Sequence, residues 1–357
     1  MQIICNLIPV LTLINPMFDN FTLSKDKLWS RRQLLKLGLA GAGVTGAATI
    51  WQMLNRSNYA NVRIPPMEME ASKGATNPMQ VLRNFDYGTL KQENGRTIRE
   101  FQLTAGTSTI QLNSAVSYNI WDLNGRIPGP TLRAKQGERV RVLFLNQAGH
   151  SHSLHFHGVH PSEMDGVRPI SNNKATIYEF DAEPYGVHLY HCHVAPVTRH
   201  IAKGLYGMFI IDPPQPRPPA DEIVLIMSGY DVNDDNRNEY YAFNGVPHHY
   251  MHHPIPIYQN QLIRIYVLNI IEFDPAVTFH LHANFFNVYR SGMTMIPSEK
   301  TDVLTMGVAE RHILEFAFRY PGKYMFHPHQ DVVAENGCMG QFEVIAAKDV
   351  KTPEKNT

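Results

Sequence analysis

Alternating apolar and polar residues predict β-strands along most of the chain from about Met79 onward. Residues 137–146 are a clear example, because arginine alternates with valine before an apolar run that ends in asparagine. Successive side chains of a strand point to opposite faces, so this alternation is typical of a half-buried strand. Turn residues such as Asn124-Gly125 and Pro128-Gly129-Pro130 separate these runs. The pattern predicts an all-β protein.

One proline-rich run interrupts the pattern and divides it into two parts. Residues 213–219 read Pro-Pro-Gln-Pro-Arg-Pro-Pro, which predicts a stiff linker of polyproline character. The strand pattern restarts after it, with another clear strand at residues 262–269. We therefore predict a flexible segment at 61–78, a first domain at 79–212, the linker at 213–219, a second domain at 220–348 and a tail at 349–357.

The second part repeats the first at a constant offset of 136 residues. The repeated residues are Tyr178-Glu179-Phe180, Gly186 and Tyr190-His191-Cys192-His193, which return as Leu314-Glu315-Phe316, Gly322 and Phe326-His327-Pro328-His329. A long repeat built of short strands predicts two copies of a β-sandwich domain rather than a solenoid.

Composition narrows the function mainly through histidine. The 357 residues suffice for two ordinary domains, and 32 acidic residues balance 32 basic ones, so nothing indicates a nucleic-acid partner. Three cysteines, Cys5, Cys192 and Cys338, cannot form a disulfide framework. The 18 histidines are unusually many, and most of them occur in pairs separated by one residue.

The N-terminal region predicts export. Arg31-Arg32 precedes a short, weakly apolar stretch at residues 37–51, which is typical of a twin-arginine signal within a leader of residues 1–60. The predicted location is the periplasm or the extracellular space. The stretch is short for a membrane span and rich in glycine and alanine, although an uncleaved anchor remains the alternative.

Four His-x-His pairs carry the candidate chemistry, and one of them surrounds Cys192. On an extended strand Cys192 faces one way while His191 and His193 face the other, so sulfur and imidazole can bind different metals. The bonded path between them is short, which suits electron transfer. Imidazole together with thiolate favours copper. A buried cysteine among ordinary histidines is the alternative for one such run, but it does not explain four pairs in two related domains.

With these motifs, the chain resembles the two-domain multicopper oxidases, also called two-domain laccases, over roughly residues 80–345. The resemblance implies two tandem cupredoxin domains, each a Greek-key β-sandwich or barrel, after the export signal. It also implies four coppers per chain: one type 1, one type 2 and two type 3.

The same resemblance assigns the ligands. Type 1 copper is held by His152, Cys192 and His200, with Leu205 as an axial residue that does not coordinate. Type 2 copper is held by His155 and His280. The type 3 pair is held by His157, His191, His193, His282, His327 and His329. In the second domain Pro328 and Val277 replace Cys192 and His152, which leaves type 1 copper in the first domain alone, the type C arrangement, with Cys338 as a buried relic.

Two enzymatic functions follow from the resemblance. The favoured one is a laccase-like oxidase that takes single electrons from a small molecule or small redox protein and reduces O₂ to water. The alternative is a copper nitrite reductase, whose loop between the cysteine and second histidine resembles the seven residues between Cys192 and His200. That family has aspartate where this chain has His155 and no imidazole where it has His193. A copper carrier without enzymatic activity would leave the four pairs unexplained.

Proton supply and assembly complete the expectations. Proton-relay candidates are Asp165, Glu163, Glu335 and His253, although a solvated loop residue is the favoured interpretation of each one. The resemblance implies a homotrimer in which each first domain faces the second domain of its neighbour, while the sequence alone leaves open whether the cluster forms within one chain.

Overall fold

The computed structural model describes residues 77–346. The predictions for the leader at 1–60, for Cys5 and for the tail at 349–357 lie outside these residues, as does nearly all of the segment at 61–78. Within the described part the chain is almost entirely β, as predicted. No helix there is long and apolar enough to cross a membrane.

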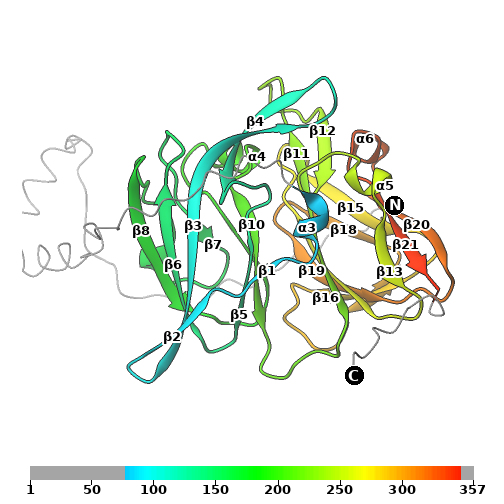
Figure 1. The fold of residues 1–357 in the computed structure, drawn as a ribbon, viewed down its shortest axis with the longest axis horizontal. Coiled ribbons are helices and arrows are strands. Elements are labelled where there is room, and N and C mark those ends of the chain that lie inside the picture. The colour runs from blue at the N-terminus through cyan, green and yellow to red at the C-terminus, as the bar shows by residue number, and fades with distance from the viewer. Residues whose placement is uncertain (1–76, 347–357) are drawn as a thin grey trace, which may run out of the picture. The chain divides into compact units, whose positions relative to one another are not determined.

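The first half of the chain forms two sheets (Figure 1). One has the order β1-β5-β10-β9-β7 and the other β2-β3-β6-β8, with β4 paired to β3. Their bounds are β1 Phe85–Asp86, β2 Thr89–Glu93, β3 Arg96–Gln111, β4 Ser117–Leu123, β5 Thr131–Lys135, β6 Arg139–Asn146, β7 His155–Phe156, β8 Lys174–Asp181, β9 Gly186–His191 and β10 Tyr206–Asp212. The 3₁₀ helix η2 at Ser162–Met164 and helix α4 at Val197–Ala202 lie in the connections.

The second half forms two further sheets, of order β12-β11-β14-β19-β16-β17 and β13-β21-β20-β15-β18. The strands are β11 Asp221–Tyr230, β12 Tyr240–Phe243, β13 Ile255–Tyr258, β14 Ile263–Asn269, β15 Ala276–Leu281, β16 Phe286–Arg290, β17 Glu299–Thr301, β18 Val303–Gly307, β19 Arg311–Phe316, β20 Gly322–His327 and β21 Gly340–Ile345. Helices α5 at His249–His252 and α6 at Asp331–Glu335 connect strands of this half.

The sequence repeat is a repeat of topology. In the first half β5 pairs in parallel with β10, which continues antiparallel to β9 and β7; in the second half β13, β21, β20 and β15 repeat this order. Gly186 and Gly322 begin the equivalent strands β9 and β20, which end at His191 and His327. The duplication read from the sequence is therefore confirmed in the fold.

Burial follows from the side-chain alternation. Strand β6 alternates between buried and partly buried positions, as its arginine–valine pattern predicts. Strand β9 is buried on both faces: Tyr190 packs into the core of the first half, while Val187 and Leu189 pack into a separate core shared with the second half. This shared core fixes the two halves against one another by burying apolar surface.

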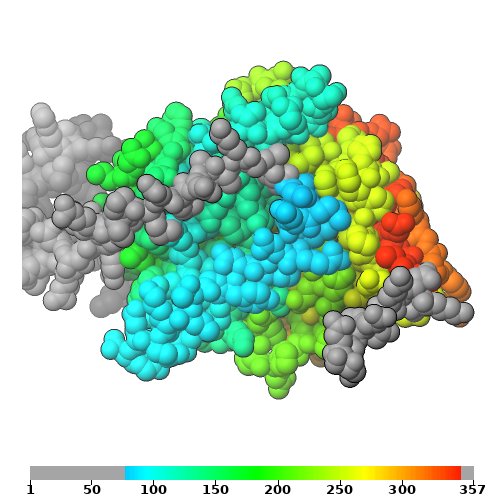
Figure 2. Space-filling view, in the orientation of Figure 1, coloured from blue at the N-terminus to red at the C-terminus, as the bar shows by residue number. Residues whose placement is uncertain are grey.

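The residues just after the predicted start of the first domain at Met79 pack on the second half of the chain. Helix α3 at Pro78–Val81 is followed by Leu82, which is buried in the core of the second half. The Tyr250 hydroxyl donates to the Pro78 carbonyl oxygen at 2.7 Å, and Arg83 pairs with Asp221 at 2.7 Å. In the space-filling view the segment drawn in blue accordingly lies against the yellow surface of the second half (Figure 2). The first half begins, by packing, only at β1.

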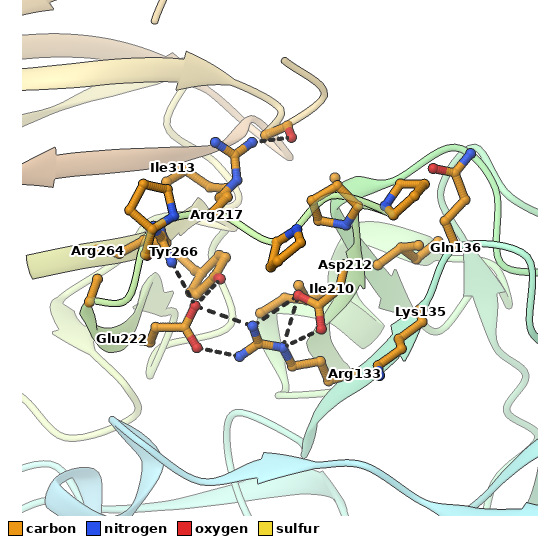
Figure 3. A pocket seen from close by; sticks show the side chains of 18 of the residues that line it. Arg133, Lys135, Gln136, Ile210, Asp212, Arg217, Glu222, Arg264, Tyr266 and Ile313 are labelled. Atoms are coloured by element: carbon orange, nitrogen blue, oxygen red, sulfur yellow. Dashed lines mark hydrogen bonds and ion pairs between the residues drawn. The ribbon is translucent and has the colours of Figure 1, made fainter. Parts of the chain in front are cut away.

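The proline-rich linker passes beside a cavity of about 500 Å³ (Figure 3). Arg133 from β5 binds Asp212 at 2.9 Å and Glu222 from β11 at 2.5 Å, and Arg264 binds Glu222 at 3.1 Å. The pair between Arg133 and Glu222 links the two halves. None of the predicted metal ligands lines this cavity.

Candidate metal centres

His152, Cys192 and His200, here called the His₂Cys group, lie together in the first half. The Cys192 Sγ lies 3.1 Å from His200 Nδ1 and 3.7 Å from His152 Nδ1, and the two Nδ1 atoms are 3.1 Å apart. His152 precedes β7, Cys192 follows β9 and His200 lies on α4, so three separate elements bring their ligand atoms to one point. His152 and Cys192 are fully buried and His200 is 6% exposed.

The electrostatics of the His₂Cys group suit a metal. Burial lowers the pKa of His152 to about 4 and also lowers the pKa of His200, so both imidazoles are neutral near pH 7 and retain a lone pair. Burial raises the pKa of the Cys192 thiol, while hydrogen bonds from Val194 and Ser153 lower it. A bound metal would deprotonate this thiol. Two imidazoles and one thiolate fit a blue-copper site.

Leu205 supplies no ligand atom to this group. It is 1% exposed and packs in the same core cluster as Cys192, whose backbone N–H donates to the Leu205 carbonyl oxygen at 3.0 Å. An aliphatic side chain at this position leaves a three-ligand donor set.

The domain 1 histidine group consists of His155, His157, His191 and His193. The Nε2 atoms of His157 and His191 face one another at 2.8 Å. The ring of His193 stacks on that of His155, with centroids 4.8 Å apart and an interplanar angle of 25°. Cys192 thus joins one group while its two neighbours join another, as the strand geometry predicts.

The domain 2 histidine group consists of His280, His282, His327 and His329. The Nε2 atoms of His282 and His327 face one another at 2.9 Å, which repeats the pair in the domain 1 group. The rings of His280 and His329 lie 5.3 Å apart. The two groups are therefore built alike, as expected for duplicated domains.

Backbone carbonyls select the ring nitrogen that is left free. The Nδ1 atoms of His191 and His327 donate to the carbonyl oxygens of the following residues at 2.8 and 2.7 Å. The Nδ1 atom of His155 donates to the Asp165 carbonyl at 2.9 Å, and that of His280 to the Asp302 carbonyl at 2.8 Å. These bonds fix the tautomer that presents an unprotonated Nε2 to a metal.

Two hydroxyl groups hold the backbone at His193 and His329 in equivalent ways. The Ser153 hydroxyl accepts a hydrogen bond from the backbone N–H of His193 at 3.3 Å, and the Thr278 hydroxyl accepts one from the backbone N–H of His329 at 2.6 Å. The sequence analysis missed Ser153, Thr278 and Asp302. The offset of 125 residues that relates His155 to His280 also relates Ser153 to Thr278, and this signal could have revealed the pair.

Burial lowers the pKa of four histidines in the two groups. Burial and, to a smaller extent, neighbouring histidines lower the pKa of His157 to about 3 and of His191 to about 4. Burial also lowers the pKa values of His155 and His282. Neutral imidazoles are the form that binds a metal ion.

The two histidine groups are separate in the described part of the chain. The sets of ligand atoms that lie within 4.8 Å of one another contain residues of one half only: His155, His157 and His191 in one set, and His280, His282 and His327 in another. Each group thus contains only the imidazoles of its own half, which are half of the expected cluster ligands.

The four relay candidates differ in position. The Asp165 carboxylate lies 3.0 Å from His155 Nδ1 and 3.3 Å from His160 Nε2, a histidine that the sequence analysis did not select. Glu163 and Glu335 are exposed on η2 and α6. His253 is exposed, and its ring stacks on His249. Of the four, only Asp165 is brought to a residue of either histidine group.

Trp121 is a further residue that the sequence analysis missed. Its indole centroid lies 4.7 Å from that of His200, 5.0 Å from that of His152 and 5.5 Å from that of His150. Trp121 lies near the end of β4, just ahead of the turn at Asn124-Gly125. In the sequence this segment is marked by its turn residues, and a single tryptophan beside them gives no sign of a contact with the histidines.

Duplicated cupredoxin-like β-sandwiches with a buried His₂Cys group and two histidine groups define a two-domain copper protein. Multicopper oxidase family models match residues 104–216 and 216–348. The chain belongs to the multicopper oxidase family, a family of copper-containing oxidoreductases.

Known proteins of similar sequence or structure include multicopper oxidases and other copper proteins. A solved multicopper oxidase is 44% identical, with a TM-score of 0.75 over 78% of this chain and 100% of its own. The copper-containing nitrite reductase of Neisseria gonorrhoeae is 26% identical over 264 residues, which are 68% of this chain and 67% of the relative. Copper resistance protein A of Escherichia coli is 27% identical over 231 residues, 60% of this chain but 33% of the relative.

Proposed function

We propose that the protein is a laccase-like oxidase. Bound copper would supply one-electron transfer at the His₂Cys group and four-electron reduction of O₂ to water at a trinuclear cluster held by the two histidine groups. The ligand set is the one that the family resemblance implies, with four coppers per chain. The electron donor is a small molecule or a small redox protein.

One observation carries the choice of oxidase. His155 and His193 are the positions at which the sequence departs from nitrite reductases, and their rings stack at 4.8 Å within the domain 1 histidine group. Both imidazoles are thus available to a cluster that needs more ligands than a single type 2 copper. A nitrite reductase would have no use for the second of them.

The residues between the two sites favour rapid electron transfer. Cys192 and His191 are adjacent in sequence, and His191 Nδ1 donates to the Cys192 carbonyl oxygen at 2.8 Å. This gives a bonded route and a hydrogen-bonded route from the thiolate to the domain 1 histidine group. Asp165, in contact with His155 and His160, is the best placed of the four candidates to hold a proton beside the cluster.

Nitrite reduction is the second candidate function. It is favoured by the relatives from Neisseria and by the loop from Cys192 to His200, whose length resembles that of nitrite reductases. Both functions would use the same His₂Cys group.

Copper counting together with acceptor assays separates the two functions. We expect four coppers per chain, O₂ consumption with a phenolic donor, and no nitrite-dependent turnover without O₂. About two coppers per chain with turnover on nitrite would instead establish the reductase.

Assembly is part of the proposal, because the two histidine groups are separate in the described chain. We propose a homotrimer in which each domain 1 histidine group meets the domain 2 group of a neighbour. Closed cyclic symmetry makes all three interfaces equivalent and leaves no half-site without a partner. Exposed apolar residues close in sequence to these groups support an interface there: Val167, Phe285 and Val332. We further propose that the twin-arginine leader directs the protein to the periplasm or beyond it.

A further inference from the structure

Trp121 is partly exposed and packs against the buried His₂Cys group. Two members of that group, His152 and Cys192, are fully buried, and the third, His200, is 6% exposed. The partly exposed indole contacts both imidazoles, with interplanar angles of 58° to His200 and 60° to His152. A molecule at the protein surface can therefore touch the indole, which in turn contacts both imidazoles.

The backbone around Trp121 holds the indole in this place. The Trp121 N–H donates to the Lys203 carbonyl oxygen at 2.9 Å, which ties β4 to the end of the helix that carries His200. The Trp121 carbonyl oxygen lies 2.6 Å from the position that a Cβ atom would take at Gly204, where φ is +116°. Only glycine allows this close approach without strain. The contact between the indole and His200 is thus built into two elements.

We propose that Trp121 is the contact through which electrons enter the His₂Cys group. This inference rests on the proposed function, since it needs copper in that group. Copper held by this group would accept one electron from a donor beside β4, and a phenolic donor would release its proton to solvent. The indole couples the donor to His200 electronically and is not itself oxidised.

The surroundings of Trp121 favour a small, planar aromatic donor. The exposed imidazole of His150 lies 5.5 Å from the indole, which adds a second ring to the contact surface. The nearby cations are already paired: Arg199 with Asp231 at 3.2 Å and with Asp234, and Lys203 with the face of Tyr118 at 4.0 Å. Little uncompensated charge remains to steer an acidic or basic redox protein.

Replacement of Trp121 tests the route by the rate of copper reduction. Copper-loaded protein is mixed without O₂ with excess 2,6-dimethoxyphenol, and loss of the blue absorption is followed. We expect the rate to fall severalfold in Trp121→Phe and further in Trp121→Leu. Tyr185→Leu, which truncates a partly buried aromatic side chain on the same core, should keep the wild-type rate. The blue band and the reduction potential should stay unchanged in all three variants.

The outcomes separate an electron route from a packing role. Equal rates in all variants overturn the inference, as does a shift in reduction potential large enough to explain the slower reduction. If Trp121→Leu loses copper, Trp121→Phe still decides the question. A wild-type protein without any blue band would overturn both the proposed function and this inference, whereas a normal blue band with unaffected rates overturns the inference alone.

Fluorescence provides a readout that does not depend on any donor. The sequence has three tryptophans, and Trp121 becomes the sole tryptophan, excited selectively at wavelengths that tyrosine does not absorb, in full-length protein carrying Trp29→Phe and Trp51→Phe. We expect cupric ion to quench most of this emission when it loads the His₂Cys group. A Cys192→Ser substitution in the same background should largely restore it. Unquenched emission from blue protein would show that the contact does not exist in solution.

Discussion

At the residue scale, hydrogen bonds to the backbone decide which atom of each histidine can bind a metal. His155, His191, His280 and His327 all donate Nδ1–H to a carbonyl oxygen, so all four present Nε2. In the His₂Cys group the opposite choice is made, and His152 and His200 direct Nδ1 toward Cys192. The same residue type therefore serves two kinds of site, because its ring nitrogens differ in what they bond.

Replacing Cys192 with serine should abolish the blue site while the fold survives. A serine hydroxyl is a poor copper ligand, and the substitution removes the thiolate that joins the two sites. We expect loss of the blue absorption and of donor oxidation, measured by visible spectroscopy and O₂ uptake. Retained cluster copper would serve as the control for folding. Turnover at the wild-type rate would contradict the assignment of Cys192.

Replacing Leu205 with methionine should retain the blue colour and lower the reduction potential. The side chains have similar volumes, so the cost in stability should be below about 1.5 kcal/mol. A thioether can approach copper as a weak axial ligand, which an aliphatic side chain cannot do. Redox titration of the blue band measures the change. An unchanged or raised potential would show that the axial position belongs to another residue.

At the element scale, the connections around α4 and β9 position the His₂Cys group. Strand β9 is buried on both faces and delivers Cys192 directly after its last residue, while α4 returns His200 to the sulfur. The turn at Gly204 then leads the chain from α4 into β10, next to Trp121. Local backbone geometry thus supports a ligand set whose members come from distant positions in the sequence.

Replacing Gly204 with alanine should destabilise this turn. A Cβ atom would lie 2.6 Å from the Trp121 carbonyl oxygen and 2.7 Å from Ile127 Cδ1, at a φ of +116°. We expect the free energy of unfolding to fall by roughly 1–3 kcal/mol, measured by urea denaturation. Gly137→Ala is the matched control, because φ there is +88° and no atom lies within 4 Å of the added carbon. Equal losses in the two variants would mean that the close approach to Trp121 has no energetic weight.

Acid should destabilise the copper-free protein through its buried histidines. The folded-state pKa values of His152, His157 and His191 lie at about 4, 3 and 4, below the ordinary value of 6.5. Between these values the unfolded chain binds more protons than the folded one, so stability is present above pH 6.5 and falls as the pH drops toward 4. Each group contributes at most roughly 1.4 kcal/mol per pH unit. Urea unfolding from pH 7.5 to 4.5 measures the slope, which His157→Gln should flatten; an unaltered slope would contradict the burial argument.

At the scale of the whole molecule, the two halves share a core but do not share a histidine group. Val187 and Leu189 of β9 pack with residues of the second half, and Arg133 and Glu222 connect the halves by an ion pair. This packing leaves the domain 1 and domain 2 histidine groups as separate sets within the described chain. The arrangement of the halves is therefore the observation on which the proposed trimer rests.

Mixing two defective subunits tests the assembly. One variant carries His155→Ala and His157→Ala, and the other His280→Ala and His282→Ala; each alone should lose its cluster copper and O₂ reduction. When the two are unfolded, mixed and refolded together, some interfaces should combine two intact groups and regain activity. Metals that bridge subunits would also stabilise the assembly, because they bind the trimer and not the separate chains. No recovery on mixing, or a monomer that holds a full set of copper, would reject the ring.

Local patterns in the sequence suffice to predict the strands, the duplication and the His-x-His pairs, and the family resemblance built on them assigns the candidate ligands. Residues 139–146 alternate as a strand must, and the offset of 136 residues in the sequence already relates the segments that form β9 and β20. The His-x-His pairs and Cys192 likewise stand out by spacing alone. All of these features can be predicted because each is carried by residues close together in the chain or by a constant offset.

Features that depend on contacts between distant segments were set by the tertiary fold. The meeting of Cys192 with His152, the carbonyl of Asp302 beside His280, and the indole of Trp121 against His200 all require strands from different parts of the chain to pack together. The packing of α3 on the second half follows from Leu82, a single apolar residue without a periodic pattern. The separation of the two histidine groups likewise depends on how the halves pack through their shared core. The spacing of ligands along the sequence carries no information about how one domain packs against another.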